Sequence, residues 1–307
     1  MVVYKELKSI EREIGIPAKT LYGISNNIGR HYHSVNIPKR NGGVRTLSVP
    51  DEILKKIQRQ ILEKILAYEP VSRYATGYKY GSSVQRNAQR HVGKEKILKL
   101  DIKSFFDSIQ YSTVKEKVFR TNKYSENIRV LLSMLCYQKD SLPQGAPTSP
   151  MITNIIMRDF DEKVGSWCRE RGIVYSRYCD DMTFSANDFN SDDVKTFVRN
   201  ELKTMKLYLN EKKTTEISSH KRQVVTGIVV NQKLNVSSEY KRAIRQEVYF
   251  CKKFGVESHL KAIGSDVSAE KFLQGLLGRI SFVLQTCNDK EFIEYKIYVG
   301  EQLKKFR

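Results

Sequence analysis

Cysteine is scarce in this sequence, and its few cysteines form no recognisable motif. There are five, an odd number, and no two of them have CxxC spacing. Disulfide frameworks and zinc modules both need paired or closely spaced cysteines. Long apolar runs are lacking too: none approaches the roughly 18 residues of a membrane span, and the first ten residues have no signal-peptide core. We expect a cytoplasmic protein with no membrane partner.

Repeats, low-complexity stretches and linkers are also missing. The seven prolines in 307 residues are isolated interruptions rather than parts of a linker. Hydrophobic residues make up 40% of the chain and aromatic residues 10%, which is enough for a sizeable core and argues against disorder. The length suits either one large domain with several lobes or two small domains.

Acidic residues are fewer than basic residues in this sequence. The chain has 53 Lys and Arg against 34 Asp and Glu, and its formal net charge is +19. An excess of this size, spread along the chain, favours a polyanionic partner, most simply nucleic acid. Charge alone does not distinguish such a protein from a basic protein that binds anions only loosely.

Apolar patterns predict four strands that matter for the argument. A strand over Ile97–Ile102 would carry Asp101 near its C-terminal end. The β-prone runs 173–179 and 182–186 flank Asp180 and Asp181 with hairpin spacing. We expect the last strand over Gln223–Asn231.

Helical spacing and capping residues predict the intervening helices. Asp51 is a candidate N-cap, Ser82 and Gln85 have capping-box spacing, and Ser149 with Pro150 forms an N-cap and N1 pair. The helices are expected at about 51–66, 82–93, 126–137, 149–172, 191–207, 238–254 and 268–286. The central part then has the order β-α-β-β-α-β, which is that of the ferredoxin-like fold.

This order predicts a cluster of carboxylates. The first strand and the central hairpin are neighbours in such a sheet, so Asp101 and Asp180 are expected to meet although they lie far apart in sequence. An isolated Asp-Asp dipeptide is usually a turn, but carboxylates from adjacent strand ends suit Mg²⁺. Two Mg²⁺ ions about 4 Å apart would activate a hydroxyl and stabilise a leaving pyrophosphate. The pattern therefore indicates nucleotidyl transfer.

Several motifs, in order, resemble those of reverse transcriptases. Tyr178-Cys179-Asp180-Asp181 resembles their YxDD box, Leu100–Asp107 their first carboxylate motif, and Leu142–Pro150 their LPQGxPxSP loop. Ile37–Arg45 resembles the fingers motif, and Gly227–Val230 the strand that closes the palm. The resemblance implies an α+β right-hand polymerase with a ferredoxin-like palm, fingers and a small helical thumb.

Two further motifs resemble one branch, the bacterial retron reverse transcriptases. Asn87–His91 matches their NAxxH signature and Val225–Gly227 their VTG signature. This branch implies an RNA-directed DNA polymerase that copies its own structured noncoding RNA into a branched, RNA-linked single-stranded DNA (msDNA) in antiphage defence. Either signature could instead serve only local packing.

The resemblance also implies domains and partners. Fingers and palm would occupy 1–235, with the fingers mainly in 1–100 plus an insertion between the first palm strand and the Pro150 helix, and an RNA-binding thumb would occupy 236–307. Expected partners are the cognate noncoding RNA, the RNA–DNA duplex, dNTPs and an effector or toxin protein. Since we expect no RNase H domain after the thumb, template removal would need host RNase H.

Physics and resemblance together suggest the catalytic and metal-binding residues. Asp101, Asp180 and Asp181 would be catalytic and would hold two Mg²⁺ ions, with the Ile102 carbonyl as an extra ligand. Phe106 resembles the steric gate that excludes a ribose 2′-hydroxyl, whereas its neighbour Phe105 is expected in the core.

The remaining site residues follow from the resemblance alone or from charge. The expected nucleotide-binding residues are Lys39, with Arg40 as a competitor, and Arg45 on the triphosphate, Gln144 on the sugar and Lys213 as general acid for pyrophosphate. The expected RNA-binding residues are Asn87, His91, Gly145, Arg242 and Arg245.

Three alternatives remain open at this point. Another bacterial reverse transcriptase, of the group II intron, diversity-generating or abortive-infection type, would share every catalytic motif. A non-catalytic RNA-binding protein would explain the charge but not the carboxylates. A nucleotide cyclase on a similar palm would use paired acids without needing the Leu142–Pro150 loop.

Overall fold

The computed structural model describes residues 3–38 and 42–306, and the chain divides into two compact units. The first unit consists of Met1–Ser82, Leu98–Phe184 and Phe189–Glu216, and the second of Ser83–Ile97, Ser185–Asp188 and Ile217–Arg307. The expected division into 1–235 and 236–307 is based on resemblance and stays a prediction.

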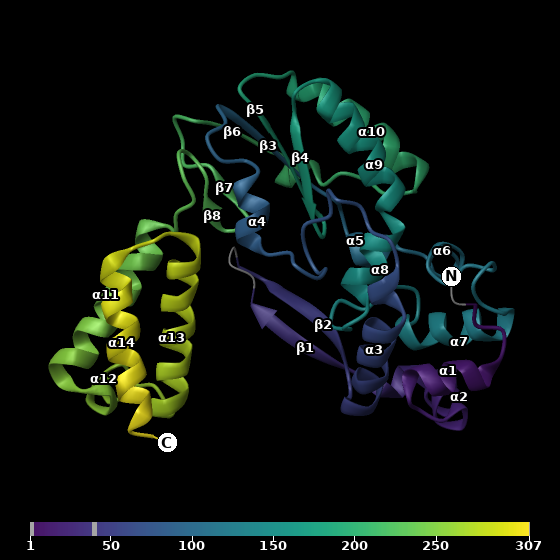
Figure 1. Cartoon of the computed structure of the whole chain (residues 1–307), viewed down its shortest axis with the longest axis horizontal. Helices are drawn as coiled ribbons and strands as arrows, with labels where there is room; N and C mark the ends of the chain where they lie inside the picture. Colours follow the sequence, from purple (N-terminus) through teal and green to yellow (C-terminus); the bar gives the residue numbers. More distant parts are fainter. Residues whose placement is uncertain (1–2, 39–41, 307) are drawn as a thin grey trace. The chain divides into compact units, whose positions relative to one another are not determined.

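The N-terminal part of the first unit combines helices with a two-stranded hairpin (Figure 1). The antiparallel strands β1 (Tyr32–Pro38) and β2 (Val44–Pro50) pair so that Pro38 lies opposite Val44. Asp51 caps the next helix as predicted, because its Oδ1 accepts a hydrogen bond of 2.9 Å from the Leu54 N–H. The helices of this part are α1 (Leu7–Ile14), α2 (Ala18–Asn26), α3 (Glu52–Lys64) and the 3₁₀ turns η1 (Ile28–His31) and η2 (Leu66–Tyr68).

The chain contains a four-stranded sheet, whose strands are β3 (Lys96–Asp101), β4 (Val174–Tyr178), β5 (Asp181–Ala186) and β6 (Thr215–Ser218). Their order across the sheet is β4-β5-β3-β6. The first and third strands are central and the second and fourth lie at the edges, as in a β-α-β-β-α-β fold. Helix α9 (Arg158–Glu170) packs against β4, and α10 (Ser191–Thr204) packs against α9 (Figure 1).

The prediction for the last strand was wrong. The fourth strand of the sheet is β6, whereas Gln223–Asn231 holds two short strands, β7 (Val224–Val225) and β8 (Ile228–Val229), that pair only with each other. The apolar run is broken because Thr226 and Gly227 have φ angles of 46° and 84°. Positive φ at both central residues is the geometry of a tight hairpin turn.

The long helix expected at 149–172 is divided. Helix α8 (Ser149–Ile156) ends at Met157, after which α9 begins. The N-cap is Thr148 rather than Ser149, whose hydroxyl donates instead to the Pro143 carbonyl at 2.7 Å. The other helices between β3 and β4 are α5 (Phe105–Ser108), α6 (Tyr111–Lys117) and α7 (Glu126–Cys136), and the 3₁₀ turn η3 (Glu211–Lys213) precedes β6.

In the second unit, helix α4 (Val84–Gln89) packs against β7 and β8. The helix begins after Ser83, whose hydroxyl accepts from the Arg86 N–H, so the expected cap at Ser82 was one residue early. The Gly93 N–H donates to the Val230 carbonyl at 3.0 Å. A small core joins these elements and contains Ala88, Ile97, Val225, Ile228 and Val230.

The rest of the second unit is helical (Figure 1). Helices α11 (Ser238–Phe254) and α13 (Ala269–Thr286) agree with the sequence prediction, and their N-caps are Ser237 and Ser268. The sequence analysis missed α12 (Val256–Ala262) and α14 (Lys290–Lys304), which pack against α13. In the described part of the chain, no helix combines the length and the apolar character that a membrane span requires.

Candidate active site

Three carboxylates come from the ends of adjacent strands in the first unit. Asp101 is the last residue of β3, Asp180 lies in the turn after β4, and Asp181 begins β5. A hydrogen bond of 3.1 Å from the Ile102 N–H to the Asp180 carbonyl joins the end of β3 to this turn. The fold thus brings together the acids that the sequence analysis singled out.

These carboxylates line one open cavity of about 1300 Å³ in the first unit. Its walls come from the β1–β2 hairpin, the segment after β3, the loop before α8 and the β4–β5 turn. Other lining residues include Arg45, Tyr78, Lys99, Ile102, Phe105, Phe106, Gln144, Tyr178, Asn210 and Lys213. The cavity is therefore both acidic at its base and accessible to a large substrate.

Negative charge in the cavity is incompletely compensated. Burial, followed by repulsion from Asp181 and Asp101, raises the pKa of Asp180 above its ordinary value. Burial and repulsion from Asp101 also raise the pKa of Asp181, although Lys99 opposes this. A site with surplus negative charge of this kind favours cation binding.

Asp101 is held by two side chains that follow α10. Its Oδ1 accepts from Asn210 Nδ2 at 3.1 Å, and its Oδ2 accepts from Lys213 Nζ at 2.8 Å. The Asn210 N–H also donates to the Asp101 carbonyl at 2.8 Å. The hydrogen bond to Asp101 is the main reason why the pKa of Lys213 is raised.

The donor set fits Mg²⁺ in its chemistry. Hard carboxylate oxygens that carry uncompensated charge, open to solvent on one side, are what this ion binds. Within residues 3–38 and 42–306, no three His, Cys, Asp or Glu side chains are drawn together as an assembled ion site. One of the Asp101 oxygens, Oδ2, is paired with the Lys213 ammonium group at 2.8 Å.

The predicted gate residue faces the cavity. Phe106 is half-buried, whereas its neighbour Phe105 is only 3% exposed and belongs to the core. Their ring centroids lie 5.7 Å apart. Phe105 thus supports the ring that is in a position to contact a ligand.

Of the residues predicted to contact the nucleotide, some line the cavity and others lie outside the described residues. Arg45 on β2 and Gln144 before α8 both line the cavity, whereas Lys39 and Arg40 lie outside the described residues. Gly145 packs against β2: a Cβ atom there would lie 2.4 Å from the Ser48 carbonyl oxygen. This contact gives the glycine a role within the protein, separate from the template contact expected for it.

Sequence reasoning missed three cavity residues. Lys99 lies two residues before Asp101, and strand alternation could have placed it on the same face. Asn210 carried no comparable signal. Tyr78 has a φ of 56°, its ring lies 5.5 Å from that of Tyr178, and burial raises its pKa to about 12. A left-handed φ at a bulky residue is uncommon and often marks a functional site.

The two short signature motifs meet in the second unit. Asn87 Nδ2 donates to Thr226 Oγ1 at 3.4 Å, and this hydroxyl donates to the Val84 carbonyl at 3.2 Å. His91 lies 2.7 Å from the Ser185 hydroxyl through Nδ1, and burial lowers its pKa to about 3. Asn87 and His91 are both buried, at 1% and 0% exposure. Their RNA-binding role stays a prediction.

The two predicted RNA-binding arginines of α11 differ in their surroundings. Arg242 is exposed. Arg245 is half-buried, donates to Glu291 Oε2 at 2.8 Å and lies over the Phe292 ring. Arg242 is therefore better placed for an external phosphate.

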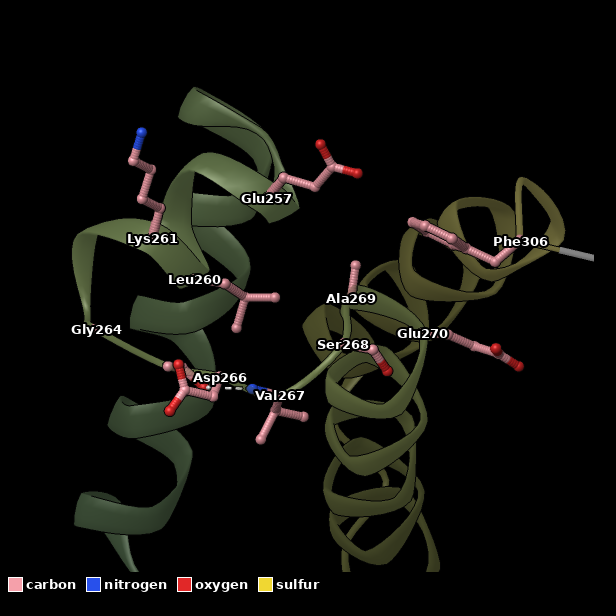
Figure 2. Close-up of a pocket in the computed structure, with 11 residues that line it drawn as sticks. Glu257, Leu260, Lys261, Gly264, Asp266, Val267, Ser268, Ala269, Glu270 and Phe306 are labelled. Atoms are coloured by element: carbon pink, nitrogen blue, oxygen red, sulfur yellow. Dashed lines mark hydrogen bonds between the residues drawn. The ribbon is translucent and has the colours of Figure 1, made fainter.

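A second, smaller hollow of about 630 Å³ lies between α12, the start of α13 and the end of the chain in the second unit (Figure 2). It also contains acidic residues, Glu257, Asp266 and Glu270. Figure 2 shows that their carboxylates point in different directions. This hollow therefore lacks the converging acids of the larger cavity.

Comparison with known proteins identifies the family. The model of the family described as "Reverse transcriptase (RNA-dependent DNA polymerase)" matches residues 37–244. The retron Ec83 reverse transcriptase of Escherichia coli is 33% identical over 237 residues, which cover 71% of this chain and 75% of that protein. The chain belongs to the reverse transcriptase family.

Other relatives assign this reverse transcriptase, an RNA-directed DNA polymerase, to the retron type. The retron Mx65 enzyme of Myxococcus xanthus is 31% identical over 274 residues, covering 83% of this chain and 62% of that protein. The retron Ec86 enzyme of Escherichia coli is 29% identical over 265 residues, covering 84% of this chain and 82% of that protein. The alignment thus spans less than two thirds of the Mx65 protein. The expected right-hand polymerase fold is confirmed by the family.

Among solved structures, the sequence identity is lower than among these relatives. The apo telomerase of Candida tropicalis superposes with a TM-score of 0.48 at 13% identity, covering 89% of this chain and 58% of that chain.

Proposed function

We propose that this retron-type reverse transcriptase copies its own structured noncoding RNA into msDNA, a branched, RNA-linked single-stranded DNA, and takes part in antiphage defence. The convergence of Asp101, Asp180 and Asp181 on one open cavity is the observation that carries the polymerase chemistry. The retron relatives support the specific product, since they are named for retrons.

The carboxylates are proposed to hold two ions. Two Mg²⁺ ions bound by Asp101, Asp180, Asp181 and the Ile102 carbonyl would lower the pKa of the primer hydroxyl and stabilise charge on the departing pyrophosphate. Lys213, whose ammonium group donates to Asp101 Oδ2 at 2.8 Å, is proposed to act as the general acid that would protonate the departing pyrophosphate.

Other cavity residues are proposed to orient the nucleotide. Arg45, with Lys39, would bind the triphosphate through charge-assisted hydrogen bonds. Gln144 would contact the sugar, and the Phe106 ring would collide with a ribose 2′-hydroxyl. Both rings line the cavity, and the greater exposure of Phe106, which is half-buried while Phe105 is 3% exposed, supports Phe106 as the gate.

The segment 236–307 is proposed to be an RNA-binding thumb. Basic residues such as Arg242 would contact phosphates, and RNA of A-form shape would be recognised mostly through its backbone and 2′-hydroxyls. Arg245 would contribute less, because Glu291 already pairs with it. Asn87 would act indirectly by holding the turn between β7 and β8, His91 by holding Ser185 at the end of β5, and Gly145 by fixing the loop before α8.

Several partners are inferred from the retron type rather than from side-chain geometry. We expect cytoplasmic synthesis from dNTPs, priming from a 2′-hydroxyl of the noncoding RNA, template removal by host RNase H and action beside an effector or toxin protein.

Template-dependent DNA synthesis tests the polymerase chemistry. We expect the purified chain to extend a DNA primer on an RNA template with Mg²⁺, and the double variant Asp180→Asn, Asp181→Asn to fall to background. Asp188→Asn is the matched control, because Asp188 is exposed and outside the cavity. Equal synthesis by the double variant and the parent would refute the role of these acids, and background activity in both would favour a pure RNA-binding protein.

Recovery of nucleic acid tests the retron product. Cells expressing the chain with its neighbouring RNA locus should contain a discrete DNA that stays joined to RNA after protein removal and separates on debranching. If an active enzyme with an intact locus yields no such species, the retron product is wrong and another type of bacterial reverse transcriptase is favoured.

A further inference from the structure

A fully buried ion pair lies behind the carboxylate turn. The side chains of Arg177 on β4 and Asp161 on α9 are both 0% exposed. Arg177 Nε donates to Asp161 Oδ1 at 2.8 Å and Nη2 donates to Oδ2 at 2.6 Å. The Tyr175 hydroxyl donates to the same Oδ1 at 2.8 Å. The carboxylate thus fixes the plane of the guanidinium group from one side.

The remaining N–H group of the Arg177 guanidinium reaches the turn between β4 and β5. Arg177 Nη1 donates to the Cys179 carbonyl oxygen at 2.8 Å. Cys179 has a φ of 59°, a left-handed conformation that costs a non-glycine residue free energy. On the other side of the turn, the Asp180 carbonyl accepts from the Ile102 N–H at 3.1 Å. Both carbonyl groups that flank Asp180 are therefore held, and its side-chain rotation is the main freedom left.

The same guanidinium group also braces the loop that packs on Tyr178. Arg177 Nη2 donates to Asn154 Oδ1 at 3.2 Å, and Asn154 Nδ2 donates to the Gly77 carbonyl at 2.9 Å. Gly77 lies against the Tyr178 ring so closely that a Cβ atom would be 3.0 Å from it. The network thus holds both the Cys179 carbonyl within the YxDD box and the loop that packs on the Tyr178 ring.

Stability alone is a weak reason for this arrangement. Burying two charges is costly, and replacement of a buried ion pair by apolar side chains of similar volume is often neutral or stabilising. A guanidinium group supplies donors in a planar fork to three acceptors at once, which the single ammonium group of lysine does not. The feature that needs arginine is the simultaneous contact with Asp161, Asn154 and the Cys179 carbonyl.

We propose that Arg177, oriented by Asp161, is a positioning residue for metal binding: by holding the Cys179 carbonyl it sets the direction in which Asp180 presents its carboxylate to a divalent cation. This inference rests on the proposed role of Asp180 as a metal ligand. Residues that orient metal ligands typically contribute about 10–100-fold to metal affinity or activity.

Arg177→Lys tests the proposal. Mn²⁺ affinity, measured by electron paramagnetic resonance without nucleotide, should fall at least about tenfold. The Mg²⁺ concentration for half-maximal primer extension should rise by a similar factor. The KM for dNTP, measured at saturating Mg²⁺, should change much less.

A second variant separates positioning from packing. The triple variant Asp161→Leu, Tyr175→Phe, Arg177→Met removes the buried charges and the donor to Cys179 together, so it should be more stable than Arg177→Met alone, which leaves the Asp161 carboxylate buried without its partner. We expect the same loss of Mn²⁺ affinity as in Arg177→Lys. A folded triple variant with parental Mn²⁺ affinity would overturn the proposal.

Glu69→Gln is the control for general destabilisation. Glu69 is a buried acid that pairs with Arg120 and Lys123, and it does not line the cavity. It should lose stability but keep parental Mn²⁺ affinity, and an equal loss of affinity in this variant would also overturn the proposal. If the parent binds Mn²⁺ yet synthesises no DNA, the proposed function fails while the positioning effect is still measured.

Discussion

Lys213 Nζ lies 2.8 Å from Oδ2 of Asp101, so a cation supplied by the protein itself sits at the rim of the carboxylate cluster. The lysine side chain is 57% exposed, whereas that of Asp101 is 7% exposed. Water screens the ammonium group more than the acid, and Lys213 together with Lys99 does not prevent the pKa of Asp180 and that of Asp181 from being raised. This imbalance leads to a prediction about stability.

Removing acids from the cluster should stabilise the protein in the absence of metal. The pKa of Asp180 and that of Asp181 are raised in the fold, mainly by burial, so the charged forms oppose folding above those values. Because Asp180 is half-buried and Asp181 is exposed, water screens part of this repulsion, and the double variant Asp180→Asn, Asp181→Asn should unfold about 2 °C higher than the parent at pH 7.5 in EDTA. The gain should shrink as pH falls toward the ordinary carboxyl pKa. An unchanged or lower melting temperature at pH 7.5 would contradict this, and Asp188→Asn serves as control.

Shortening Phe106 should relax sugar selection. Its ring lines the cavity, so Phe106→Ala would leave room for a 2′-hydroxyl. We expect the ratio of kcat/KM for dNTP to that for rNTP to fall at least about tenfold, the lower end of what one methylene group contributes to discrimination in a pocket. Phe105→Leu, which alters the buried neighbour, should lower stability but keep the ratio. An unchanged ratio in Phe106→Ala would show that another residue is the gate.

Gly145→Ala should destabilise the first unit. The new Cβ would lie 2.4 Å from the Ser48 carbonyl oxygen, so the loop or β2 must shift. We expect a loss of about 1–3 kcal/mol in the free energy of unfolding, measured with urea. Gly275→Ala in α13 is the matched control, because its Cβ would meet nothing within 4 Å and alanine favours a helix. Equal stability of the two variants would refute the crowding argument.

His91 should make the protein sensitive to mild acid. Burial lowers its pKa to about 3, so the folded protein keeps it neutral while the unfolded chain takes up a proton below about 6.5. This contribution to stability is complete above that pH and is lost as pH falls toward 3, at about 1.4 kcal/mol per pH unit. The contribution has the opposite sign to that of Asp180 and Asp181.

The variant His91→Gln isolates this contribution. Urea unfolding between pH 7 and pH 5 should show a shallower pH dependence in His91→Gln than in the parent, whereas His220→Gln, at an exposed position, should retain the parental slope. Parallel curves for the parent and His91→Gln would mean that the buried imidazole is already charged.

The sequence specified the carboxylate cluster because strand ends and a hairpin place acids by simple periodicity. Asp101 follows an apolar strand, and Asp180 and Asp181 interrupt two others, so topology alone predicts that they meet. The edge strand was misplaced because β6 is short and half-polar, whereas the apolar run around Thr226 matches a strand better. The positive φ values that break this run depend on tertiary contacts, including the hydrogen bond from Asn87.

Other parts of the site depend on loop paths that periodicity does not encode. Tyr78 and Asn210 reach the cavity on irregular segments, and their positions follow from backbone hydrogen bonds such as that from Asn210 to the Asp101 carbonyl. The need for glycine at Gly145 likewise comes from β2, which is distant in sequence. Local sequence patterns therefore predicted the catalytic carboxylates. The other residues that line the cavity are positioned by contacts between segments distant in sequence.

The bond between Asn87 and Thr226 has a practical consequence for anyone who recombines these enzymes. The segments 83–97 and 217–230 are linked, since Asn87 on the first donates to Thr226, a residue of left-handed φ, on the second. A chimera that exchanges only one segment with a distant relative would mismatch the pair. Exchanging the two segments together should preserve the hairpin of β7 and β8. They therefore act as one exchangeable unit, although they lie far apart in sequence.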